Sequence, residues 1–131
     1  DLFVLTSLYE GFPNAMTEAM TLGCPVVAAN CMTGPAEILT KDYRAAQKAT
    51  GILEGEYGIL FPTMDPQENL DPSCITKEQR QLAETICGLL SDPQKLDAYA
   101  KAAKRRAADF GEETYAERFC RLAEDAGKAA N

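Results

Sequence analysis

The sequence has 131 residues, 46% of them apolar and 25% charged, which is typical of one globular domain with a buried core. Its formal net charge of −7 excludes the basic surface that attracts phosphate backbones, so nucleic acid is not an expected partner. No apolar run reaches the roughly 20 residues that cross a bilayer, and no basic stretch precedes an apolar one at the N-terminus, so we expect a cytoplasmic protein.

The first elements in the chain alternate between strand and helix. Residues 2–6 are an apolar run that predicts a buried strand, and because it starts at once we expect further strands of the same domain upstream. Residues 14–22 have helical spacing, with Asn14 as the expected N-cap and Gly23 as the stop signal. Residues 24–29 read as a second buried strand, so the three elements predict a crossover between parallel strands.

The middle of the chain contains shorter elements. Residues 33–39 predict a short helix, with Pro35 at its first position and Glu37 near the positive end of its dipole. Residues 41–56 read as a surface loop or a frayed helix. Residues 57–61 predict a third strand, and residues 63–75 a second surface loop.

The last part of the chain is predicted to be helical. Thr76 and Gln79 form a capping box that opens one helix, and Asp92 with Pro93 opens the next. A final helix follows Gly111. We expect the apolar stripes of these helices to be core, at Leu82, Ile86, Leu89, Leu90, Leu96, Tyr99, Ala103, Phe110, Tyr115, Phe119, Leu122 and Ala126.

Together these elements predict an α/β fold that is part of a Rossmann-like domain, with parallel strands, helices on both faces and a helical C-terminal tail. We expect one domain over residues 1–131, with a strand-helix-strand region in 1–62 and the helical tail in 76–131. The five cysteines include no C-x-x-C pair, and there is no histidine. They are therefore expected to be reduced, mostly buried and not part of a metal site.

The residues most suited to ligand binding follow the first strand, where open α/β sheets bind their ligands. Glu10 lies in the loop, and Glu18 lies about one turn into the helix, so both carboxylates are expected to face one crevice. The helix start offers unpaired N–H groups and a positive dipole end, which suit a diphosphate. A carboxylate one turn further suits ribose hydroxyls, while Gly11 permits close approach of a ligand and Pro13 stiffens the loop.

The string E-G-F-P-N-A-M-x-E-A-M-x-x-G-x-P-V-V-A, followed by G-P-A-E-I-L and Y-G-I-L-F-P, resembles the donor half of the family 4 retaining glycosyltransferases. The resemblance implies the two-Rossmann architecture called GT-B, in which this chain is part of the C-terminal, donor-binding domain. It implies that Glu10 is the catalytic Glu, which contacts the donor sugar near its anomeric carbon. Glu18 matches the Glu that holds the ribose.

The same resemblance assigns the remaining donor-binding residues. Backbone N–H groups around Gly11, Phe12 and Pro13 match those that meet the sugar hydroxyls, although Pro13 itself has none to give. Asn14 and Ala15 match the helix start that meets the diphosphate, and Gly34 and Glu37 match a loop at the pocket rim. In this interpretation a nucleotide-diphosphate sugar, such as a UDP-sugar, is the substrate, and a glycan or lipid-linked molecule accepts the sugar with retention.

The resemblance further implies an N-terminal acceptor domain of the same protein, and a basic pair against the diphosphate, both upstream of these residues. No cofactor is implied, and the absence of a D-x-D motif agrees with a site that needs no metal. The chain without that domain is expected to be inactive. Lys101, Lys104, Arg105 and Arg106 are interpreted as solvated surface, with contact to an anionic membrane as a minor alternative.

Other functions remain open at this point. Taken alone, Glu18 is more often a solvated helix carboxylate, and Glu37 a partner of the helix dipole. The main alternative function is therefore a noncatalytic α/β module that binds nucleotide or another protein. A related epimerase or phosphorylase is a less favoured third hypothesis, since the paired Glu residues do not match it.

Overall fold

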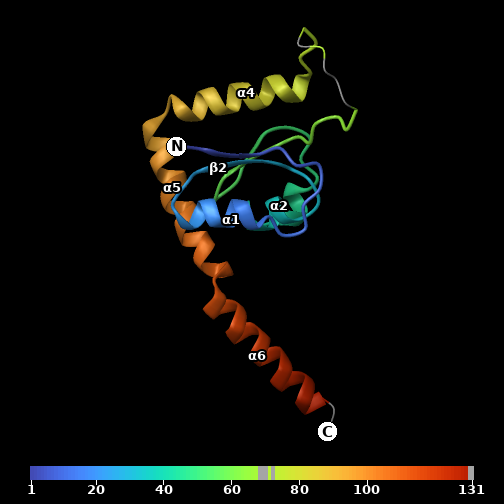
Figure 1. The fold of residues 1–131 in the computed structure, drawn as a ribbon, viewed down its shortest axis with the longest axis vertical. Helices are drawn as coiled ribbons and strands as arrows, with labels where there is room; N and C mark the ends of the chain where they lie inside the picture. The colour runs from blue at the N-terminus through green and yellow to red at the C-terminus, as the bar shows by residue number, and fades with distance from the viewer. Residues whose placement is uncertain (68–70, 72, 130–131) are drawn as a thin grey trace.

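A central sheet with helices on both faces organises the chain (Figure 1). The computed structural model describes residues 1–67, 71 and 73–129. α1 (Asn14–Thr21) and α2 (Gly34–Leu39) cover one face of the sheet, and α4 (Lys77–Leu90) covers the other. The predicted α/β fold is confirmed.

The sheet has four strands in the order β1-β2-β4-β3. β1 (Phe3–Leu5), β2 (Val26–Ala29) and β4 (Ile59–Phe61) are parallel to one another, as predicted. β3 (Leu53–Glu54) adds an antiparallel edge strand, which the sequence pattern did not predict. The sheet is therefore mostly parallel rather than wholly so.

The central strand β2 explains why both faces need a helix layer. All four of its residues are buried, and alternate side chains point to opposite faces. Val26 and Ala28 join a core with the side chains of α1 and α2, whereas Val27 and Ala29 join a second core with those of α4. A buried parallel strand of this kind requires apolar residues at every position.

α1 is anchored to the sheet by two methionines. Met16 and Met20 are fully buried, and they lie four residues apart on the same face of the helix. The helix ends as predicted, because Gly23 adopts a positive φ of 77°. The amides of Gly23 and Cys24 then bond the carbonyls of Met20 and Ala19, which closes the helix in a Schellman motif.

The segment 41–56 is more ordered than expected. Asp42 caps α3 (Tyr43–Ala46) by accepting a hydrogen bond from the Ala45 amide, and β3 follows. α2 begins at Gly34, so Pro35 is its second residue rather than its first. In the predicted loop 63–75, residues 68–70 and 72 lie outside the described residues, and the others form neither helix nor strand.

Local capping signals determine where the later helices start. The capping box of Thr76 and Gln79 opens α4, and the Asp92 side chain accepts from the Lys95 amide at the start of α5 (Pro93–Ala107). Most of the predicted core face is confirmed, but Leu90 is 51% exposed because it lies one residue beyond the buried position of Leu89. The 3-10 turn η1 (Ala108–Phe110) follows α5.

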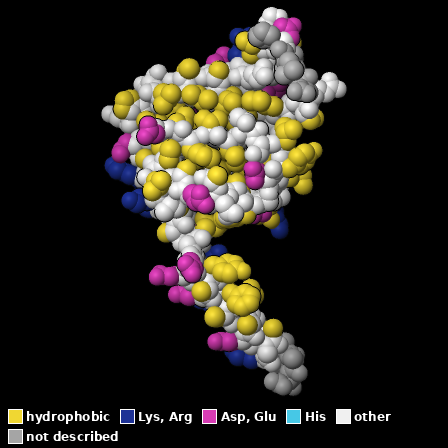
Figure 2. Space-filling view, in the orientation of Figure 1, with side chains coloured by type: hydrophobic (Ala, Val, Ile, Leu, Met, Phe, Trp, Pro, Cys, Tyr) yellow, Lys and Arg dark blue, Asp and Glu magenta, His cyan; other side chains and the backbone are white. Residues whose placement is uncertain are grey.

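The final helix, α6 (Glu112–Ala129), projects from the body of the molecule. Its apolar stripe was expected to be core, yet Tyr115, Phe119 and Leu122 are 69%, 61% and 69% exposed, and Ala126 is exposed too. Figure 2 shows hydrophobic side chains along this helix, clear of the body. The prediction is wrong for the described part of the chain, where no element covers that face.

None of the five cysteines forms a disulfide, as expected, but most of them are not buried. Only Cys31 is buried; Cys24 is half-buried, and the other three are exposed. Two of these, Cys87 and Cys120, lie on solvent-facing positions of α4 and α6. Burial raises the pKa of the Cys31 thiol, which keeps it protonated and unreactive near neutral pH.

Candidate functional site

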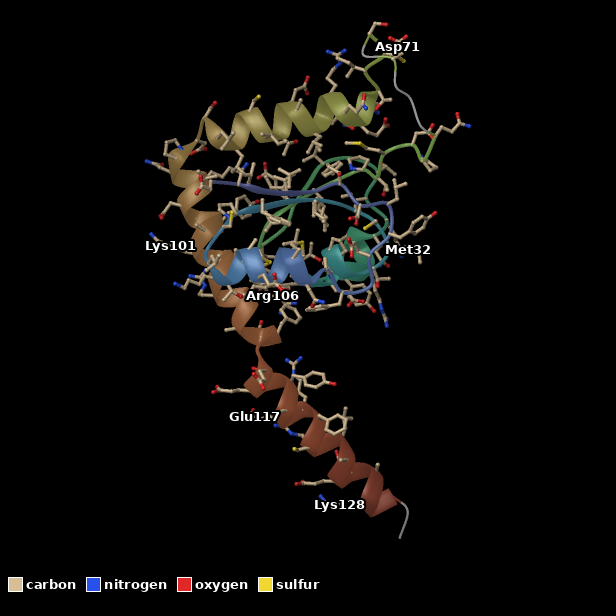
Figure 3. All side chains as sticks on the ribbon, viewed as in Figure 1. Met32, Asp71, Lys101, Arg106, Glu117 and Lys128 are labelled. Carbon is tan, nitrogen blue, oxygen red and sulfur yellow. The ribbon has the colours of Figure 1, made fainter. Side chains whose placement is uncertain are left out.

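The loops that follow β1 and β2 are joined at the carboxyl edge of the sheet. The Glu10 amide donates to the carbonyl oxygen of Met32 at 3.3 Å, and the Thr33 amide donates to the carbonyl oxygen of Glu10 at 2.9 Å. Figure 3 shows Met32 at this edge. The backbone of Glu10 is therefore fixed relative to the sheet, at the place where the sequence predicts the site.

Gly34 brings the two loops into direct contact. A Cβ atom added there would collide with the carbonyl oxygen of Gly11 and would lie 2.6 Å from Cδ of Pro13. Only a glycine allows this approach, since real Cβ atoms do not come so close to other atoms. Gly34, predicted at the rim, is buried and acts by packing against the loop that carries Glu10.

The Glu10 side chain is half-buried and held by a neighbour. Ser7 Oγ donates a hydrogen bond of 2.7 Å to Glu10 Oε1. An ionised carboxylate accepts about four hydrogen bonds, so this carboxylate retains acceptor positions for a ligand hydroxyl. Ser7 thus orients Glu10 without saturating it.

Pro13, not Asn14, occupies the N-cap of α1, and no side chain caps this helix. The predicted Asn14 cap is wrong because Asn14 already has helical geometry. The Pro13 carbonyl accepts the amides of Met16 and Thr17, and the Asn14 carbonyl accepts from Thr17 Oγ1. The first turn is closed by backbone groups, which leaves the tip of the helix open.

Four amides around the tip of α1 have no hydrogen-bond partner among the described residues: those of Gly11, Phe12, Asn14 and Ala15. All four residues are exposed. Unpaired amides at a helix start carry partial positive charge and favour anions. The structure therefore brings together the predicted Gly11–Ala15 segment and Glu10 at one edge.

Phe12 lies against an aromatic side chain that the sequence pattern does not connect with the site. Its ring centroid is 5.4 Å from that of Phe110 in η1, at an interplanar angle of 60°. The two rings line a groove of about 390 Å³ together with Asp109, Glu112, Tyr115 and Arg118. Only the three-dimensional contact reveals this link, because the two phenylalanines are distant in sequence.

Arg106 connects α5 with α2 and is not solvated surface, contrary to the prediction. Its Nε donates to the carbonyl of Ile38 at 3.0 Å, and its second terminal nitrogen donates to the carbonyl of Glu37 at 2.8 Å. The guanidinium also lies 5.0 Å from the ring centroid of Tyr57 and 4.8 Å from that of Phe110. An arginine binding the last carbonyls of a helix stabilises that end.

The two remaining predicted carboxylates are exposed. Glu18 lies on α1 opposite the Met16 and Met20 face, and among the described residues its side chain has no hydrogen bond or ion pair. Glu37 lies in the first turn of α2, where its carbonyl rather than its carboxylate makes the contact with Arg106. That Glu10 and Glu18 share one cleft stays a prediction.

Comparison with known proteins points to one family. Residues 1–58 match the family described as glycosyl transferases group 1. An uncharacterised glycosyltransferase of Methanocaldococcus jannaschii is 32% identical over 111 residues, which are 82% of this chain and 27% of that protein. The chain thus spans about a quarter of that relative's length.

Two solved structures share the fold. Sucrose-phosphate synthase from Thermosynechococcus elongatus superposes with a TM-score of 0.66 at 25% identity, over 96% of this chain and 25% of that one. HepE of Anabaena, solved in complex with UDP, gives a TM-score of 0.67 at 26% identity, over 95% of this chain and 28% of that one. The chain therefore belongs to the group 1 glycosyltransferases and has the α/β fold of their GT-B domains.

Proposed function

We propose that this chain forms the donor-binding part of a retaining glycosyltransferase, which transfers a sugar from a nucleotide diphosphate to a glycan or lipid-linked acceptor. The observation that carries the proposal is the group of four exposed, unpaired amides at the tip of α1, beside the fixed loop of Glu10. This group lies within the residues that match the family.

The tip of α1 is suited to the diphosphate of the donor. The amides of Asn14 and Ala15 are unpaired, and the helix dipole places about half a positive charge at this end. The N-cap residue, Pro13, makes no side-chain hydrogen bond to the helix, so no side-chain acceptor competes with an anion for the first amides. The same amides would stabilise the negative charge that develops when the diphosphate leaves.

The carboxylates are proposed to bind hydroxyl groups of the donor. Glu10, oriented by Ser7 and by the backbone contact with Thr33, would contact the sugar near its anomeric carbon. Glu18, which is exposed and unpaired among the described residues, would accept hydrogen bonds from the ribose. The similarity to a protein solved with UDP supports a nucleotide at this site.

The complete reaction is proposed for a longer protein. Since the chain spans about a quarter of the relatives reported above, we infer that an acceptor-binding domain and basic residues for the diphosphate lie in the rest of the protein. The site is proposed to need no metal. The full protein is proposed to be cytoplasmic, and contact with a membrane surface is an alternative for it. Within the described residues, no helix has the length and apolarity to cross a membrane.

Calorimetric titration of the chain with UDP, GDP and ADP tests the proposal. At least one nucleotide should bind, and Glu18→Ala should weaken that binding by about 10- to 100-fold, because hydrogen bonds to a charged group contribute about 1.5–3 kcal/mol. Glu117→Ala is the matched control, since Glu117 is an exposed glutamate on α6, away from the site (Figure 3).

Two results would refute the proposal. One is the absence of binding for all three nucleotides, which favours the noncatalytic interaction module instead. The other is an equal effect of the Glu18 and Glu117 substitutions, which would show that general charge rather than the ribose contact changes the affinity.

A further inference from the structure

The contact between Phe12 and Phe110 joins the proposed donor loop to the far end of the chain. The centroid distance of 5.4 Å and the angle of 60° give the tilted geometry that aromatic pairs favour. Phe12 lies between Gly11 and Pro13, so its side chain anchors the segment whose amides are unpaired. Phe110 belongs to η1, which directly precedes α6.

Phe110 is itself held in place. Its ring packs against the core formed by α1, α2 and β2, and the Arg106 guanidinium lies 4.8 Å from its centroid. Arg106 cannot move freely, because it donates to the carbonyls of Glu37 and Ile38 and pairs with Asp109 at 2.8 Å. Phe12 therefore packs against a Phe110 ring whose position is fixed by its neighbours.

The other restraints on this loop come from the loop itself, where Ser7 bonds the Glu10 carboxylate, and from residues 32–34. Glu10 is bonded to Met32 and Thr33, and the Gly11 carbonyl is packed against Gly34. The ring of Phe12 contacts Phe110 and so links the loop to the helical part of the chain. A pre-shaped loop loses less conformational entropy on binding, so this link affects ligand affinity.

We propose that Phe110 is a positioning residue of the donor site. Through the ring of Phe12 it holds the unpaired amides of Gly11 and Phe12, and the helix start at Asn14 and Ala15, in the arrangement that receives a nucleotide sugar. The role in binding rests on the function proposed above, whereas the restraint on the loop does not. The helical end of the chain, outside the residues 1–58 that match the family, thereby contributes to the site.

Hydrogen exchange without nucleotide tests the restraint. Phe110→Leu should accelerate exchange in peptides that cover residues 7–17, whose Glu10, Met16 and Thr17 amides are hydrogen-bonded, because leucine keeps the apolar packing and removes the ring contact. Phe119→Leu is the matched control, since Phe119 is 61% exposed on α6 and should leave these peptides unchanged. Phe12→Leu provides a second variant that spares the core and should reproduce the acceleration.

A double-mutant cycle in the affinity for UDP tests the consequence for binding. Each single change, Phe12→Leu or Phe110→Leu, should weaken binding by roughly 2- to 12-fold, the range expected for loss of an aromatic pair. The double variant should be no weaker than the weaker single variant, because both remove the same contact. If Phe110 had only a structural role, Phe110→Leu would lower the melting temperature, and its effect on the affinity for UDP would not depend on Phe12.

Unchanged exchange of the hydrogen-bonded amides in residues 7–17, or equal acceleration in Phe119→Leu, would overturn the proposal. Effects of the two substitutions that multiply in the double variant would overturn it as well. Accelerated exchange in a chain that binds none of the nucleotides would support the loop restraint and would refute the proposed function, so the two claims fail separately.

Discussion

Removing the Arg106 guanidinium should destabilise the fold well beyond the cost of losing a surface charge. Arg106→Met keeps most of the aliphatic stem and removes the donors to Ile38 and Glu37, which lie at 3.0 and 2.8 Å. Such charged hydrogen bonds contribute about 1.5–3 kcal/mol each, and each aromatic contact adds about 0.5–1 kcal/mol. Because the side chain is 22% exposed, the lower values apply, and together they give a loss of about 4 kcal/mol in the free energy of unfolding.

Urea denaturation of Arg106→Met and Arg105→Met measures this difference. Arg105 is the neighbouring residue on α5, is exposed, and has no hydrogen bond or ion pair among the described residues. Its substitution should change the free energy of unfolding by less than about 0.5 kcal/mol. Equal stability of the two variants would refute the reasoning, because it would show that the α2 carbonyls do not depend on Arg106.

Three further predictions follow from particular contacts and shifts. Gly34→Ala should lower the free energy of unfolding by about 1–3 kcal/mol in urea denaturation, because its methyl group collides with the Gly11 carbonyl. Gly88→Ala, which adds a methyl group in open space on α4, should not destabilise the fold. Equal losses in the two variants would contradict the predicted collision. Burial, with nearby carboxylates, raises the pKa of Tyr99 from 10.0 to about 12, so its contribution to stability is complete below pH 10 and is lost as pH rises towards 12. The melting temperature of Tyr99→Phe should therefore fall less over this interval than that of wild type, while exposed Tyr115→Phe should behave as wild type; identical profiles for all three would contradict it. Replacing Mg²⁺ with EDTA should change the Kd for UDP by less than about twofold in calorimetry, and loss of binding would contradict a metal-independent site.

Much of the fold follows from local signals in the sequence. The apolar runs of β1, β2 and β4 have a length and an apolar continuity that fit a buried parallel sheet. The Thr76 and Asp92 caps and the stop at Gly23 depend on neighbouring residues only, so their positions were predictable.

The elements that were missed depend on distant contacts. β3 has two residues and becomes a strand only by pairing with β4, so its own pattern is too short to predict it. The charge run on α5 gives no sign that Arg106 alone turns towards the carbonyls of α2. The apolar stripe of α6 was predicted as a face but wrongly as core, because periodicity identifies an apolar face and does not show what covers it.

The site shows the same division. The positions of Glu10 and of the tip of α1 at the carboxyl edge follow from the order of strand, loop and helix. The cap at Pro13 and the support of Phe12 by Phe110 depend on exact backbone geometry and on tertiary packing. Neither leaves a pattern in the sequence.

Titration of the ¹⁵N-labelled chain with UDP, followed by amide chemical shifts, tests most directly whether the tip of α1 receives the diphosphate. The largest shifts should come from the amides of Asn14 and Ala15, with smaller shifts at the adjacent Gly11 and Phe12; all four amides lack partners among the described residues. Shifts that cluster elsewhere, for example on α4 or α6, or a titration without shifts at these four residues, would contradict the account.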